Sequence, residues 1–231
     1  MNEPATYSPS ISVIVPSLAE RERIAGTLWT LRDQLGPGDE LRVVDGGSGD
    51  GTAEVAAALA DAVELSKPGR ATQMNRGAEG ARGDVFWFVH ADTEVLPGAA
   101  EILREAVSKG AQWGRFDIEI AGTSRWFPLL AALINRRSCW SGIATGDQGI
   151  FVTRQTFAAV GGYPSLPLME DVALSSVLRK RQRPACLPRL LRTSGRRWEK
   201  RGVWRTVLLM WSLRFAYAIG IPAERLVSYY R

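Results

Sequence analysis

The amino-acid sequence predicts an α/β protein in which a mostly parallel central sheet is flanked by helices and followed by a C-terminal helical appendage. Short apolar runs alternate with amphipathic stretches through the first half of the chain. This β-α-β-α-β-α-β order is typical of a parallel sheet covered by helices on both faces. A long apolar segment at 203–221 then predicts a helix near the C-terminus.

The individual elements follow from hydrophobic periodicity and from the residues that break it. Residues 11–15 are largely β-branched, which suits a strand buried on both faces, and this strand stops at Pro16. Ile24, Leu28 and Leu31 recur at helical spacing, which predicts an amphipathic helix. The predicted strands are 11–15, 41–44, 62–65, 85–89, 113–120 and 149–152, and the predicted helices are 20–35, 52–59, 70–81, 97–109, 127–135 and 168–180.

Length and composition indicate one large domain with an appendage. The chain has 231 residues, of which 45% are hydrophobic and 23% are charged. We expect a disordered lead at 1–9, without an export signal, a domain at 10–200 and a helical segment at 201–231. The two cysteines, Cys139 and Cys186, are too few for a disulfide framework, so we expect both to be buried and reduced in a cytoplasmic protein.

The positive charge of the chain lies late in the sequence. The net charge is +5, and much of the excess falls in 179–183 and 189–205. Such a patch favours phosphates, an anionic membrane surface or nucleic acid, and it is equally compatible with a solvated basic surface. The charge therefore indicates a preference for anions without naming one.

The apolar segment 203–221 is predicted to be a buried or membrane-surface helix. Trp204, Leu208 and Trp211 lie at helical spacing within it. Arg205 and Arg214 would each cost about 2.5–3.5 kcal/mol at the centre of a bilayer, which argues against a membrane span. An interfacial position at the inner face of the membrane stays open.

The stretch FWFVHADTE, 86–94, delivers a carboxylate to the end of a predicted buried strand. Asp92 follows the apolar run, and His90, the only histidine of the chain, precedes it by two residues. Open α/β sheets bind ligands at the carboxyl ends of their strands. The pattern is compatible with a metal site and with an ordinary strand end.

The glycine-rich loop DGGSGDG has two functional interpretations. Asp45, Gly47, Gly49 and Gly51 resemble the first motif of S-adenosylmethionine methyltransferases, and Glu64 lies about where such an enzyme holds the ribose. In that fold, however, the loop follows the first strand, whereas here a strand and a helix precede it. The alternative is a loop that binds a nucleotide by close approach of its backbone.

The ordered set of motifs resembles the family 2 glycosyltransferases of the GT-A fold. The motifs are PSLAE, VVDGGSGDGT, the Asn75-x-Gly77 pair, FWFVHADTE and MED, and the resemblance covers roughly 10–201. The chain is most similar to the compact bacterial branch associated with radical-SAM and selenodomain proteins. The resemblance implies an inverting enzyme that transfers a hexosyl group from a nucleotide-diphosphate donor, with UDP as the expected nucleotide, to an acceptor hydroxyl.

By this resemblance, several segments would bind the donor. Carboxylates at the first two strand ends would accept hydrogen bonds from the base or the ribose, although Asp45 is also suited to cap its own loop. Asp147 and Gln148 of the loop TGDQG would contact the sugar or the acceptor, and Arg197 and Trp198 the diphosphate or a ring. The donor-binding candidates are Pro16, Ser17, Glu20, Asp45, Gly47, Arg70, Gln73, Asn75, Gly77, Ala91, Asp92, Asp147, Gln148, Arg197 and Trp198.

The metal site implied by the resemblance is incomplete in this sequence. The family's Asp-x-Asp motif holds a divalent cation against the diphosphate, and here it reads His90-Ala91-Asp92. Asp92 would bind Mg²⁺ or Mn²⁺, with phosphate oxygens and water completing the shell. His90 is suited to ligate Mn²⁺, to contact the ribose or to orient Asp92.

Catalysis is assigned by the same resemblance to the MED motif. Asp171 would be the general base that takes the proton of the acceptor hydroxyl, and Glu170 would support it or shape the acceptor pocket. Two acids at the start of a helix also suit the helix dipole without any catalytic role.

The resemblance leaves the acceptor and the partners open. We expect no nucleic-acid partner, a possible homodimer and a possible peripheral membrane contact through the C-terminal helix. The two alternatives to a glycosyltransferase are an S-adenosylmethionine-dependent methyltransferase and a non-catalytic nucleotide-sugar-binding protein, which the departure at His90 keeps open.

Overall fold

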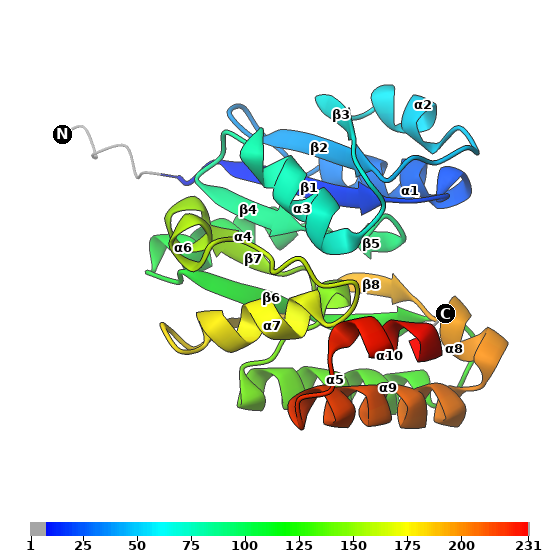
Figure 1. Cartoon of the computed structure of the whole chain (residues 1–231). Coiled ribbons are helices and arrows are strands. Elements are labelled where there is room, and N and C mark those ends of the chain that lie inside the picture. The colour runs from blue at the N-terminus through cyan, green and yellow to red at the C-terminus, as the bar shows by residue number, and fades with distance from the viewer. Residues whose placement is uncertain (1–7, 231) are drawn as a thin grey trace.

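A computed structural model describes residues 8–230, without the side chains of Arg189 and Arg197. Most of the lead predicted at 1–9 lies outside this described part. A single curled sheet runs through the molecule with the strand order β3-β2-β1-β4-β7-β6-β8-β5. Helices lie on both of its faces (Figure 1). The predicted α/β class is confirmed.

The first half of the chain forms the parallel part of the sheet. Strands β3, β2, β1 and β4 pair in parallel in that order. Every residue of β1 is buried, as expected for a strand covered on both faces. The elements are β1 (Ile11–Ser17), α1 (Arg21–Arg32), β2 (Glu40–Asp45), α2 (Thr52–Ala57), β3 (Ala62–Leu65), α3 (Arg70–Glu79) and β4 (Val85–Phe88).

The second half adds antiparallel pairing at the centre of the sheet. Strand β7 runs antiparallel to both β4 and β6, whereas β8 runs parallel to β6 and antiparallel to β5. The elements are β5 (Thr93–Val95), α4 (Ala99–Ser108), β6 (Trp113–Ala121), α5 (Phe127–Ser141), the 3₁₀ helix η1 (Gly146–Gln148), β7 (Phe151–Thr153), α6 (Arg154–Val160), α7 (Glu170–Leu178) and β8 (Ala185–Ser194).

Strand β8 is missing from the sequence prediction, which treats its arginines as part of a basic patch. Leu187, Leu191 and Thr193 are buried in the structure, so the strand contributes to the core. Its pairing with β5 places Thr193 opposite Thr93, and Thr93 directly follows Asp92 in the sequence. The residues that follow β8 therefore lie at the end of the sheet where the FWFVHADTE stretch also ends.

Three helices end the described part of the chain: α8 (Arg196–Arg201), α9 (Val203–Ala218) and α10 (Ala223–Tyr230). Leu213 of α9 and Leu226 of α10 pack with Leu168 and Met169, which precede α7. Helices α5 and α9 lie along one side of the molecule, and α10 lies beside them (Figure 1). Within residues 8–230, no helix is both long and apolar enough to cross a membrane.

The two cysteines are joined, contrary to the sequence expectation. Cys139 in α5 and Cys186 in β8 form a disulfide, with their Cα atoms 5.9 Å apart. The sequence spacing of 47 residues gave no indication of this pairing, because α5 and β8 become neighbours only when both lie against β6. The expectation of two reduced thiols is therefore wrong for this structure.

Candidate active site

A cleft of about 450 Å³ opens where β1 and β4 end, and the predicted residues Asp45 and Gly47 at the end of β2 are not part of its lining. The sheet register pairs Ser17 with Asp45 and Ile14 with Phe88, so the loops after these three strands meet at one edge. This is the edge at which open α/β sheets bind their ligands. Residues lining the cleft include Pro16, Ser17, Glu20, Arg70, Gln73, His90, Ala91, Asp92, Thr145, Asp147, Asp171, Arg196, Trp198 and Tyr230.

Asp171 lies in the first turn of α7 and is held there by backbone amides. The amide of Gly146 donates to its Oδ2 over 2.8 Å, and the amide of Val172 donates to its Oδ1 over 2.7 Å. Met169, the residue before the acidic pair, adopts a left-handed φ of 66°, which few non-glycine residues adopt. Uncommon backbone conformations of this kind cluster at functional sites.

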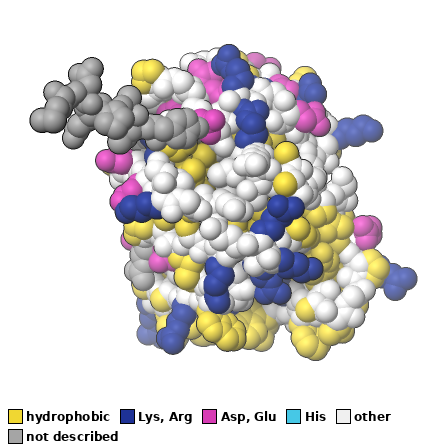
Figure 2. Space-filling model, turned by 90° about the vertical axis from the view of Figure 1, so that its left-hand side faces the viewer, with side chains coloured by type: hydrophobic (Ala, Val, Ile, Leu, Met, Phe, Trp, Pro, Cys, Tyr) yellow, Lys and Arg dark blue, Asp and Glu magenta, His cyan; other side chains and the backbone are white. Residues whose placement is uncertain are grey.

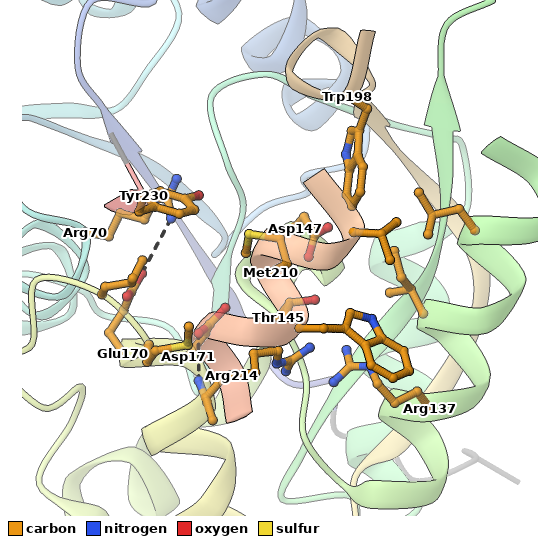
Figure 3. Close-up of a pocket in the computed structure, with 17 residues that line it drawn as sticks. Arg70, Arg137, Thr145, Asp147, Glu170, Asp171, Trp198, Met210, Arg214 and Tyr230 are labelled. Atoms are coloured by element: carbon orange, nitrogen blue, oxygen red, sulfur yellow. Dashed lines mark hydrogen bonds and ion pairs between the residues drawn. The ribbon is translucent and has the colours of Figure 1, made fainter. Parts of the chain in front are cut away.

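Glu170 points in a different direction from its neighbour. It is 4% exposed, and it lines an adjoining pocket of about 140 Å³ rather than the larger cleft. One guanidinium nitrogen of Arg70 lies 3.8 Å from its Oε1, and Tyr230 lies beside Arg70 (Figure 3). Asp171 lines both spaces. Of the two acids, Asp171 is therefore the one placed to meet groups from either side.

The environment of Glu170 favours its protonated form. Burial, and then the negative charge of Asp171, raise the pKa of Glu170 from 4.5 to about 7, against the opposing effect of Arg70. The folded protein thus binds a proton that the unfolded chain releases between these two values. With a pKa of about 7, the Glu170 carboxyl is about half protonated near neutral pH.

Replacing Glu170 by glutamine is expected to remove this pH dependence of stability. Because the folded pKa is raised, the free energy of unfolding of the native chain falls as the pH rises from 4.5 toward 7. As the pH rises from roughly 5 to 8, we expect the free energy of unfolding of Glu170→Gln to increase by up to about 3 kcal/mol relative to that of the native chain. Urea titrations of both proteins at several pH values measure this difference. If the difference in the free energy of unfolding between the two proteins does not change with pH, the raised pKa is not that of Glu170.

The loop before β7 lines the cleft with one of its two predicted residues. Asp147 lines both the cleft and the adjoining pocket, and its Oδ1 is buried without a hydrogen bond among the described residues. Burial raises the pKa of Asp147, and the charge of Asp171 adds to this effect. Gln148, by contrast, is fully buried and accepts from the amide of Thr145 while donating to Ser138. Gln148 therefore shapes the loop from behind.

His90 and Asp92 provide one nitrogen and one carboxylate at the cleft. Burial, together with the nearby charge of Arg70, lowers the pKa of His90 from 6.5 to about 3, so its imidazole is neutral and free to ligate or accept. Within residues 8–230, the carboxylate of Asp92 has no hydrogen bond or ion pair, and no group of three or more metal-binding side chains forms a cage. This donor set fits a cation that takes its remaining ligands from phosphates and water.

Several other predicted donor ligands have structural contacts in this structure. Both carboxylate oxygens of Asp45 accept hydrogen bonds, from Ser17 and from the amides and hydroxyl of Gly47 and Ser48, so Asp45 holds the glycine loop. The amide of Gln73 bridges the carbonyls of Ser17 and Val44, at the ends of β1 and β2. Direct donor contact by Asp45 or Gln73 stays a prediction.

The Asn75-x-Gly77 pair is also explained by packing. The side-chain amide of Asn75 donates to the carbonyl of Tyr163 over 2.8 Å and accepts from its backbone amide over 2.9 Å. A Cβ atom at Gly77 would lie 2.5 Å from a methyl group of Ile14, so glycine allows α3 to lie directly on β1. These residues fix α3, whose first turn then presents Arg70 to the cleft.

The far wall of the cleft comes from the segment after β8. Trp198, a residue of α8, lines the cleft and the adjoining pocket, and Figure 3 shows it above Asp147. Arg196 approaches Glu20 within 4.0 Å across the cleft. Arg197 lies in α8, but its side chain is outside the described part, so its predicted contact with the diphosphate stays a prediction.

The sequence profile described as "Glycosyl transferase family 2" matches residues 12–161. This stretch includes the ends of β1, β2 and β4 and the loop that holds Asp171, and it makes up more than half of the chain. The chain belongs to glycosyl transferase family 2. An uncharacterised glycosyltransferase of Mycobacterium tuberculosis is 34% identical over 176 residues, which are 68% of this chain and 64% of that protein. The chain thus spans less than two thirds of this relative.

Solved structures share the fold of this family 2 chain. TarS of S. aureus has a TM-score of 0.64 at 16% identity and covers 80% of this chain and 60% of its own. The mannosyltransferase PcManGT from Pyrobaculum calidifontis, solved with GDP-Man and Mn²⁺, has a TM-score of 0.64 at 23% identity, covering 94% and 66%. Glucosyl-3-phosphoglycerate synthase from M. tuberculosis has a TM-score of 0.60 at 22% identity, covering 80% and 70%. These likenesses support the predicted GT-A fold.

Family 2 membership decides between the two interpretations of the glycine loop. Glu64, the acid that a methyltransferase would need, is paired with Arg42 and Arg76 on the surface of the sheet. The loop also follows β2, the second strand of the chain, and not β1. The methyltransferase alternative is therefore set aside.

Sequence reasoning missed the site residues that come from the C-terminal helices. Met210 and Arg214 of α9, Tyr230 of α10 and Arg137 of α5 line the cleft or the adjoining pocket. No linear motif marks them, because each is brought to the site by tertiary packing. The one available signal was the presence of Arg137 and Arg214 within the apolar stretches that form α5 and α9. A charged side chain on an apolar helix face needs a partner.

Proposed function

We propose that this protein is an inverting glycosyltransferase that moves a sugar from a nucleoside-diphosphate donor to an acceptor hydroxyl. The observation that carries the proposal is the placement of Asp171. Its carboxylate is held by the amide of Gly146 and lies between the cleft at the strand ends and the adjoining pocket. A base between two binding spaces suits a reaction that joins the occupant of one to the occupant of the other.

The proposed step uses Asp171 as general base. The oxygen of the acceptor hydroxyl forms a bond to the anomeric carbon while its proton passes to the carboxylate of Asp171. The bond between the anomeric carbon and the β-phosphate oxygen breaks, and its electron pair leaves on the nucleoside diphosphate. A single displacement of this kind inverts the anomeric centre. The raised pKa of Glu170 reduces the average negative charge beside this base near neutral pH.

A divalent cation belongs to the proposal, with Asp92 and His90 as the residues that would hold it. Such a cation stabilises the negative charge that develops on a leaving diphosphate. Support comes from PcManGT, solved with GDP-Man and Mn²⁺, and from the M. tuberculosis synthase, solved with UDP and Mn²⁺. TarS was solved with UDP-GlcNAc. We retain UDP as the proposed nucleotide and Mg²⁺ or Mn²⁺ as the proposed metal.

Three finer assignments also remain proposals. They are membership of the branch associated with radical-SAM and selenodomain proteins, a homodimeric state, and a cytoplasmic location with peripheral contact at a membrane surface. The membrane contact is supported by the outer face of α9, where Leu208, Trp211 and Phe215 are exposed.

A nucleotide panel tests the proposed function directly. UDP, GDP and S-adenosylmethionine are each added with and without Mn²⁺, and the midpoint of thermal unfolding is measured. We expect a nucleoside diphosphate to raise the midpoint only when Mn²⁺ is present. Stabilisation by S-adenosylmethionine alone would sink the proposal. A hydrolysis screen across nucleotide-sugars then identifies the donor without a known acceptor.

A further inference from the structure

An apolar groove runs between α5 and α9 on the surface of the protein. It encloses about 280 Å³ and is lined by apolar side chains of both helices, with Arg137 as its charged exception. Trp126 and Trp204 close one end, with their ring centroids 5.2 Å apart. Such a lining excludes a sugar or a polar peptide as the natural occupant, because neither could replace its hydrogen bonds to water there.

The groove adjoins the pocket beside the proposed base. The pocket beside Asp171 shares five lining residues with the groove, namely Leu130, Ile134, Arg137, Val207 and Trp211. The two spaces therefore adjoin, and the inner one is lined by Asp171. Figure 3 shows this inner space, with Asp171, Arg137 and Arg214 around it.

Helix α9 contributes residues to the cleft, to the groove and to the pocket between them. Thr206 and Met210 line the donor cleft, whereas Val207 and Trp211 line the apolar groove. One helix thus presents a different face to the groove and to the cleft. The pocket lined by Asp171 adjoins both.

The rim of the groove is unusually apolar for a surface. Leu133 is 57% exposed, Leu208 is 68% exposed and Trp211 is 70% exposed. Figure 2 shows hydrophobic side chains gathered along the lower edge of the molecule, where α5 and α9 lie in Figure 1, with Lys and Arg side chains close by. Contiguous apolar surface of this kind marks a binding face.

Two arginines, Arg137 and Arg214, line the pocket beside Asp171, and Arg137 also lines the groove. Burial, and then the charge of Arg214, lower the pKa of Arg137 to about 10, and burial also lowers the pKa of Arg214. One terminal nitrogen of Arg214 is buried without a hydrogen bond among the described residues. Asp147 and Asp171 offset part of this positive charge. An anion beside the two guanidinium groups would provide an acceptor for the buried nitrogen of Arg214.

We propose that the acceptor is a lipid amphiphile whose apolar chain lies in the groove between α5 and α9, whose anionic group pairs with Arg137 and Arg214, and whose hydroxyl meets Asp171. This inference rests on the proposed function, because it assigns the acceptor class for the same base. The proposed acceptor has both an apolar chain and a negative charge, since the groove supplies apolar surface and the inner pocket supplies cations.

Binding of matched compounds tests the inference. The probe is lauroyl lysophosphatidylglycerol, which combines one apolar chain, one phosphate anion and free hydroxyls. Glycerophosphoglycerol lacks the chain, and dodecyl maltoside lacks the charge. With each compound below its micellar concentration, we expect calorimetry to show at least tenfold tighter binding of the probe than of either comparator. Shortening the chain should weaken binding by about fourfold for each methylene lost from the groove.

Two variants locate the binding. Leu129→Asp/Leu133→Asp alters exposed residues of the groove and should weaken probe binding at least tenfold, whereas Leu65→Asp, at a 71% exposed position on β3, should leave it unchanged. Arg137→Gln/Arg214→Gln should weaken binding of the probe but not binding of dodecyl maltoside. Binding of UDP with Mn²⁺ checks each variant for an intact donor site.

The outcomes separate the two proposals. If the native protein binds UDP with Mn²⁺ but binds the probe no better than the comparators, the amphiphile proposal is overturned and the proposed function stands. Probe binding that is insensitive to both groove variants also overturns it. If the nucleoside diphosphate does not bind with Mn²⁺, the proposed function fails, and the acceptor assignment fails with it.

Discussion

Asp171→Asn is expected to lower the rate of sugar transfer or donor hydrolysis by about 10²- to 10⁴-fold, the range that a general base contributes. Asparagine keeps the size of the side chain, and its carbonyl oxygen can still accept from the amide of Gly146. It cannot take a proton from the acceptor. Binding of UDP with Mn²⁺ should therefore persist while turnover is lost. Initial rates with the donor identified by the hydrolysis screen, together with calorimetric titration of UDP, measure the two effects separately.

Glu170→Gln is the comparison within the same motif. Glu170 lines only the inner pocket and is about half protonated near neutral pH, and glutamine reproduces its neutral form. We expect a much smaller loss of turnover from this change than from Asp171→Asn. Unchanged turnover in Asp171→Asn would remove Asp171 from the mechanism, and a larger loss in Glu170→Gln would transfer the role of base to its neighbour.

Asp92→Ala is expected to abolish the metal dependence of nucleotide binding. Asp92 lines the cleft, and its carboxylate is unengaged within residues 8–230, so it is available to hold a cation against the diphosphate. The affinity for UDP in the presence of Mn²⁺ should fall about tenfold or more, toward the value measured with a chelator. Calorimetric titrations of UDP, with Mn²⁺ and with a chelator, give both numbers.

Asp33→Ala is the matched control for Asp92→Ala, because it removes an exposed carboxylate at the end of α1, away from the cleft. It should leave the effect of Mn²⁺ on UDP binding intact. His90→Ala, measured in the same way, shows whether the imidazole adds to metal affinity. If Asp92→Ala retains its metal dependence, the cation is held elsewhere.

Much of the fold was predictable because its signals are local. The β-branched run that became β1 and the helical spacing of Ile24, Leu28 and Leu31 in α1 need no information about the rest of the chain. Strand β8 was not predictable in this way. Its residues 187–193 mix buried leucines with arginines, and only pairing with β6 and β5 makes them a strand.

The site was predictable in its centre and less so at its edges. Asp92, His90 and Asp171 line the cleft as expected, because motifs at strand ends and helix starts meet at one edge of an α/β sheet. Asn75, Gly77 and Gln148 belong to the same motifs, but the structure engages them in packing and loop contacts. A motif records which residues recur together and does not separate those that touch a ligand from those that hold the others.

The sequence by itself determined the α/β class, the order of the first strands and helices, the family resemblance and the acids at the centre of the site. Hydrophobic periodicity and short motifs act over a few residues, so they can be recognised without tertiary contacts. Only the tertiary structure decided that Asp171, and not Glu170, lines the cleft at the strand ends, and that Cys139 pairs with Cys186. It also decided that α5 and α9 form an apolar groove adjoining the pocket lined by Asp171. Each of these depends on which distant segments pack together, and side-chain direction at such junctions is set by packing and not by local sequence.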